Sequence, residues 1–155
     1  MENGCIIMSY KKILIPTDGS AVSMEAANQA LEIAKAMNSK VHVIYVVDIV
    51  PFVGLPTEGL WESMKEILEE EGTEALQKIK KKAKEMGLHI TSEVLEGSPS
   101  NEIVQYAEKE KMDLIVIGTS GKSGLDKILL GSVAEKVSKK AHCPVLLVKK
   151  IEIEE

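Results

Sequence analysis

The sequence contains no arginine: all 19 basic residues among its 155 are lysines. Without guanidinium groups the chain lacks the planar fork that clamps a phosphate bidentately. An anion would have to be held by ammonium groups, hydroxyls, backbone N–H groups or a metal. Aromatic residues are only 3% of the chain, which argues against a surface of stacked bases. With a net charge of −5 there is no overall positive field for nucleic acid or anionic lipid, and we expect neither as a partner.

Long apolar runs and a cysteine framework are also missing. No apolar stretch approaches the roughly 18 residues of a membrane span. The N-terminal segment MENGCIIM is too short and too weakly charged for a secretory signal. Cys5 and Cys143 lie far apart without framework spacing, which fits a reducing compartment. We therefore predict a cytoplasmic protein with no membrane association. A second methionine, Met8, leaves the true start of the chain open.

The remaining composition is that of one globular domain. Hydrophobic residues make up 45% and charged residues 28%, an ordinary balance for a folded chain of this length. We place the domain at 10–150. Residues 1–9 are expected to be a flexible N-terminal extension, and 151–155 an exposed acidic tail.

Strand and helix patterns alternate along the whole domain. The sequence predicts strands at residues 11–16, 41–47, 89–95, 113–117 and 144–148. The first two lack polar alternation, which is typical of strands buried on both faces. Helical spacing of apolar residues falls between them, with Ser20 and Asn38 expected to cap the first helix and Gly72 to bend the second. This order predicts an α/β fold: a single-domain, open five-stranded parallel sheet with helices on both faces, Rossmann-like, with strand order 3-2-1-4-5.

Two unusual loops fall where the strand order reverses, the place where such sheets bind ligands. The first, Pro16–Ser20, follows strand one. The second, Gly118–Gly124, follows strand four and carries three glycines in seven residues, which lets the backbone approach an anion closely. The helix start after it adds partial positive charge. Hydroxyls and lysines that could assist are at Thr119, Ser123, Ser132, Lys122 and Lys127.

Two familiar phosphate-binding motifs do not match these loops. The dinucleotide fingerprint needs several glycines after strand one, where only Gly19 is present. The P-loop needs a glycine five positions before its Gly-Lys-Ser, and that position is Val116. The glycine-rich loop therefore belongs to neither class.

The spacing Gly118-x2-Gly121-x9-Gly131-Ser132, together with Pro-Thr-Asp at 16–18 and Cys-Pro-Val-Leu-Leu-Val at 143–148, resembles the ATP-binding branch of the universal stress protein family. The resemblance spans 10–150. It implies an ATP cofactor whose phosphates hold Mg²⁺ or Mn²⁺. It further implies contacts to ribose and adenine from Pro16, Thr17, Asp18 and Val46, to ribose and the first phosphates from Gly118 and Gly121, and to the β- and γ-phosphates from Gly131, Ser132 and Val133.

The last strand adds a prediction of assembly. An apolar edge strand invites aggregation unless it is covered, and pairing with a symmetry mate covers it; the resemblance likewise implies a homodimer through this strand, about Pro144 to Lys150. We expect an ATP-binding stress-response protein that acts as a nucleotide-responsive homodimeric module on an unidentified protein partner. The alternatives are a slow ATP hydrolase, a nucleotidyl- or phosphoryl-transfer enzyme of the same fold, or a dimeric scaffold without ligand.

Overall fold

A computed structural model describes residues 9–54, 58–120 and 130–150. Except for Ser9, the predicted N-terminal extension and the acidic tail lie outside these residues. The elements run in the order β1 (Lys12–Thr17), α1 (Ala21–Met37), β2 (Lys40–Asp48), η1 (Val50–Phe52), α2 (Glu58–Glu85), β3 (Ile90–Gly97), α3 (Pro99–Lys109), β4 (Leu114–Gly118), α4 (Ser132–Lys140) and β5 (Val145–Val148), where η1 is a single 3₁₀ turn. No helix in the described ranges has the length and apolarity needed to cross a membrane.

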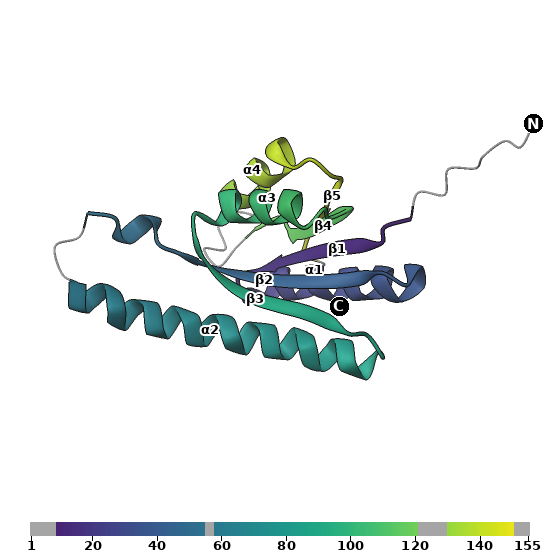
Figure 1. The fold of residues 1–155 in the computed structure, drawn as a ribbon, viewed down its shortest axis with the longest axis horizontal. Coiled ribbons are helices and arrows are strands. Elements are labelled where there is room, and N and C mark those ends of the chain that lie inside the picture. The colour runs from purple at the N-terminus through teal and green to yellow at the C-terminus, as the bar shows by residue number, and fades with distance from the viewer. Residues whose placement is uncertain (1–8, 55–57, 121–129, 151–155) are drawn as a thin grey trace, which may run out of the picture.

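The strands form one parallel sheet in the order β3-β2-β1-β4-β5, which confirms the predicted fold class. Helices α1 and α2 cover one face, and α3 and α4 cover the other (Figure 1). Both faces of the central strands are therefore buried. This explains why their sequences are continuously apolar instead of alternating.

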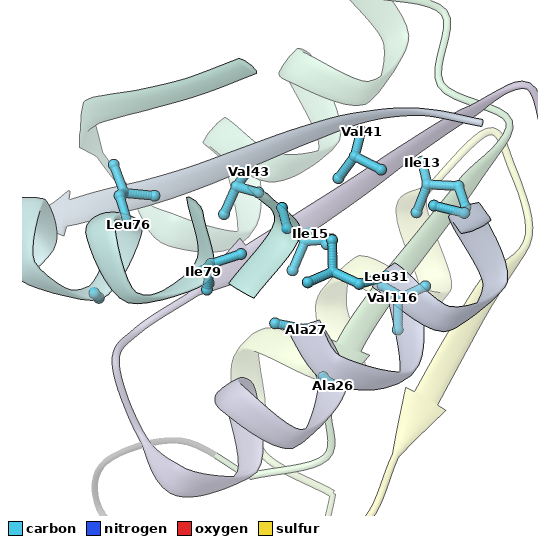
Figure 2. Close-up of a cluster of buried hydrophobic side chains, with 14 of the residues drawn as sticks. Ile13, Ile15, Ala26, Ala27, Leu31, Val41, Val43, Leu76, Ile79 and Val116 are labelled. Atoms are coloured by element: carbon cyan, nitrogen blue, oxygen red, sulfur yellow. The ribbon is translucent and has the colours of Figure 1, made fainter. Parts of the chain in front are cut away.

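Alternate residues of the central strands contribute to two separate cores. Ile13, Ile15 and Val43 point toward α1 and α2, where they meet Leu31 and Ile79 (Figure 2). Residues of opposite parity, such as Leu14 and Ile44, pack under α3 and α4. The period of two along each strand thus divides one apolar run between two helix layers.

The ends of α1 are formed as the sequence predicts. The Ser20 side chain accepts a hydrogen bond from the Ser23 N–H at 3.2 Å and caps the helix start. Asn38 adopts a left-handed conformation, with φ of 56°, at the helix end. Both caps are local features, which is why residue type alone revealed them.

Two glycines of the helices have defined neighbours. Gly72, expected to bend the second helix, lies within one continuous helix, α2, against the ring of Tyr45 on β2. Gly131 is the N-cap of α4, and Leu130 before it is 38% exposed.

Candidate functional site

A cleft of about 440 Å³ opens at the carboxyl ends of β1, β2 and β4. Its volume falls within the roughly 300–1,000 Å³ typical of ligand pockets. Residues at the start of α4 line one side of the cleft, and residues of η1 and of the first half of α2 line another. Helix α2 extends past the ends of the strands toward η1 (Figure 1). The predicted site residues that line it are Pro16, Thr17, Asp18, Val46, Gly118, Thr119, Gly131, Ser132 and Val133. Gly121 and Lys122 lie outside the described residues.

The loop after β1 is shaped by its own polar side chains. The Gly19 N–H donates to Thr17 Oγ1 at 3.2 Å, and the Ser20 N–H donates to Asp18 Oδ1 at 2.9 Å. Ser23 Oγ donates to the Ser20 carbonyl, so the 2.9 Å contact between Thr17 Oγ1 and Ser23 Oγ has Thr17 as its donor. The hydroxyl hydrogen of Thr17 is therefore used to hold the loop on α1.

The opposite wall is the N-terminal end of α4. Its N-cap is Gly131, which has no side chain to accept from the first-turn N–H groups. The Gly131 N–H donates to the Thr119 carbonyl at 2.6 Å, and the Thr119 N–H donates to the Val148 carbonyl at 2.9 Å, so the helix start is tied to β5 through the end of β4. Thr119, Ser120 and Ser132 add hydroxyls. A helix end without a capping side chain, facing a cleft, is suited to an anion.

Gly118 lines the cleft, yet its missing Cβ is explained by packing on the other side. A Cβ built there would lie 2.8 Å from Val22 Cγ1, 3.2 Å from the Val22 carbonyl carbon and 3.3 Å from the Ser23 nitrogen. The first turn of α1 thus occupies the space that a side chain would need. Gly131 has different neighbours: a Cβ there would lie 3.1 Å from the Thr119 carbonyl oxygen.

The charges of the described lining are acidic. Asp18 and Asp48 contribute carboxylates, and no lysine belongs to this part of the lining. In the described ranges there is no group of three or more His, Cys, Asp or Glu side chains able to hold a metal ion. A phosphate here would meet backbone N–H groups, hydroxyls and a helix end.

Sequence reasoning missed the apolar wall. Pro51 and Phe52 come from η1, and Met64 and Leu68 come from α2. The signal in the sequence was the apolar run at residues 49–53, between Asp48 and Gly54. Their approach to the carboxyl ends of distant strands depends on the tertiary fold.

Comparison with known proteins places these features in a family. The model of the universal stress protein family matches residues 9–149. Universal stress protein MJ0531 of Methanocaldococcus jannaschii is 65% identical over 141 residues, which cover 91% of this chain and 83% of that protein.

Solved structures agree. Protein MJ0577 of the same archaeon superposes with a TM-score of 0.81 at 35% identity and covers 93% of this chain and 99% of its own. A universal stress protein solved in complex with cAMP has a TM-score of 0.67 at 27% identity, with 91% and 98% coverage. The glycine spacing, the parallel sheet and the cleft at its reversal point therefore have one common explanation: this chain belongs to the universal stress protein family.

Proposed function

We propose that this protein binds ATP, with Mg²⁺ or Mn²⁺ held by the phosphates, and works as a nucleotide-responsive homodimeric regulatory module. The observation that carries the proposal is the start of α4, which has no capping side chain and faces a cleft with an apolar far wall. One end of the cleft suits phosphates and the other suits a base. A relative of this family solved with cAMP supports a nucleotide as the ligand class.

The register of β2 supports a base-binding role for Val46. The last residue pair between β1 and β2 is Thr17 with Tyr45, whereas β2 continues to Asp48. The Ile49 N–H donates to the Gly97 carbonyl of β3 at 3.3 Å. Because backbone groups alternate in direction along a strand, those of Val46 face the side that β1 has left. The edge of an adenine can pair there with main-chain groups.

Binding would act by mass action. A ligand that binds only the folded state stabilises it by about 2.7 kcal/mol at a hundred times its dissociation constant. It would also join the loops after β1 and β4, so the surface that a protein partner meets would depend on the nucleotide present. Mass spectrometry of the small molecule released on denaturation, together with calorimetry using MgATP, tests the ligand itself. No bound nucleotide and no heat at millimolar MgATP would contradict the proposal.

Substitution of Ser132 tests how much one backbone N–H at the start of α4 contributes to ATP binding. Ser132 is the first helical residue, where proline is well tolerated, and Gly131 before it has φ of −59° and ψ of 150°, a conformation compatible with a following proline. S132P removes one N–H and should leave the melting temperature nearly unchanged. A hydrogen bond to a charged group is worth about 1.5–3 kcal/mol, so ATP affinity should fall roughly tenfold to hundredfold.

S132A is the matched control, because it removes the hydroxyl and keeps the N–H. We expect a smaller loss of affinity in S132A than in S132P, measured by calorimetry at one salt concentration. Equal affinity of S132P and wild type would show that the helix start does not hold the phosphates.

The dimer is proposed through β5. Among the described residues β5 pairs only with β4, and Leu146 and Leu147 are 39% and 36% exposed. The Ile115 and Thr119 N–H groups donate to the carbonyls of Pro144 and Val148, so residues of the opposite parity, including Leu147, direct their backbone groups outward. An outward edge of this kind can pair with a second copy.

Leu147→Pro should therefore convert a dimer to a monomer while leaving the contact with β4 intact, since proline is tolerated where a strand N–H faces outward. Sedimentation velocity at micromolar concentration measures this, with Leu147→Ala as the control that keeps the N–H. A wild-type protein that sediments at its monomer mass of 16.9 kDa rules out the dimer.

A further inference from the structure

The only phenylalanine and the only tryptophan of this chain meet beside the cleft. The rings of Phe52 and Trp61 lie 5.0 Å apart at an interplanar angle of 45°. Trp61, on α2, packs against the larger core, whereas Phe52, on η1, lines the cleft. In a chain with so few aromatic residues, this contact positions one ring at the cleft and supports it from behind with the other.

The turn that carries Phe52 is anchored where it leaves β2. Asp48 Oδ1 accepts the Val50 N–H at 3.0 Å, and the Phe52 N–H donates to the Ile49 carbonyl at 3.0 Å. The Ile49 N–H reaches the Gly97 carbonyl at the end of β3. These bonds fix η1 to the carboxyl ends of two strands, so the position of Phe52 depends on the sheet and on Asp48.

The cleft consequently has two chemically different ends. Phe52, with Met64 and Leu68, forms an apolar wall, and Ser132 belongs to the polar end at α4. An apolar wall with an aromatic ring favours a flat heteroaromatic group. These three side chains carry no charge and no hydroxyl, so they offer no group that binds a phosphate.

We propose that Phe52 supplies binding affinity for the base of the bound nucleotide, and that Asp48 is its positioning residue, acting through the Val50 N–H. This inference rests on the proposed nucleotide binding, and it assigns the affinity for the base to one side chain of the cleft. The contribution of Phe52 is made by the base alone and is therefore the same for a nucleoside and for its triphosphate.

Calorimetry with adenosine, MgATP and magnesium tripolyphosphate separates the two ends of the cleft. Removal of a ring that contacts a base costs roughly 1–3 kcal/mol, so Phe52→Ala should weaken adenosine and MgATP by the same factor, about tenfold. Its affinity for tripolyphosphate should equal that of wild type. Phe52→Leu keeps an apolar side chain, so its affinity for adenosine should lie between those of Phe52→Ala and wild type. Circular dichroism tests whether both variants are folded.

Asp48 is tested with an acceptor-deleting and an acceptor-keeping variant. Asp48→Ala removes the acceptor of the Val50 N–H and should weaken adenosine binding severalfold. Asp48→Asn retains an oxygen at that position and should restore wild-type affinity for adenosine, a neutral ligand whose binding does not respond to the lost charge. Emission from Trp61 gives an independent readout of whether adenosine reaches this wall.

The outcomes distinguish this inference from the proposed function. If wild type binds MgATP and Phe52→Ala binds adenosine as tightly as wild type, the base wall is overturned and nucleotide binding stands. The base wall is also overturned if Phe52→Ala loses as much affinity for tripolyphosphate as for adenosine, or if wild type does not bind adenosine. If wild type binds neither MgATP nor adenosine, both proposals fail together.

Discussion

Replacing Gly118 by alanine is expected to destabilise the protein by about 1–3 kcal/mol, the usual cost of inserting a methyl group into a filled space. The new Cβ would lie 2.8 Å from Val22 Cγ1 and 3.2–3.3 Å from backbone atoms of Val22 and Ser23. The side chain of Val22 can shift, but the backbone of α1 is held by the Ser20 cap and moves at a greater cost. Urea denaturation followed by circular dichroism measures the change in the free energy of unfolding.

Val22→Ala in the same background provides the control for Gly118→Ala. It removes the nearest atom but leaves the backbone contacts, so the double variant should recover only part of the loss. If Gly118→Ala has wild-type stability and weakened ATP binding instead, then Gly118 is a ligand-approach residue, as the family resemblance implied, and the packing explanation is wrong.

Replacing Gly72 by alanine is also expected to destabilise the protein, by about 1–3 kcal/mol, although helix propensity predicts the opposite sign. Alanine in a helix interior is about 1 kcal/mol more favourable than glycine. Here the added Cβ would lie 2.6–3.0 Å from three atoms of the Tyr45 ring, and Tyr45 is only 4% exposed. Because the ring is buried in the core, moving it would disturb close packing, and we expect this cost to exceed the gain in propensity.

Gly59 provides a matched control in the same helix. Gly59 is the second residue of α2, and a Cβ built there has no heavy atom within 4 Å, so Gly59→Ala should leave stability nearly unchanged. Thermal and urea unfolding should therefore show a loss of stability for Gly72→Ala and little change for Gly59→Ala. A stabilised Gly72→Ala would mean that Tyr45 does not pack on α2 as described.

Much of the site was predictable because the loops that form it follow buried strands directly. Asp18 and Thr119 each come after an apolar run, and the carboxyl ends of parallel strands lie at one edge of a sheet. Phe52 was not predictable in this way. It follows β2 by several residues, and its place at the cleft depends on the cap from Asp48 and on contact with Trp61, which is a partner from another element.

The amino-acid sequence by itself determined the strands, the caps of α1 and the parallel arrangement, because each follows from local composition: continuous apolar runs need two helix layers, and Ser20 and Asn38 act on their own helix. Only the tertiary structure decided what the glycines do. Gly72 and Gly118 are next to elements distant in sequence, Tyr45 and α1, and the space that a side chain would need is set by what packs there. Glycine looks the same in the sequence whether its missing Cβ makes room for a ligand, for an aromatic ring or for a helix backbone.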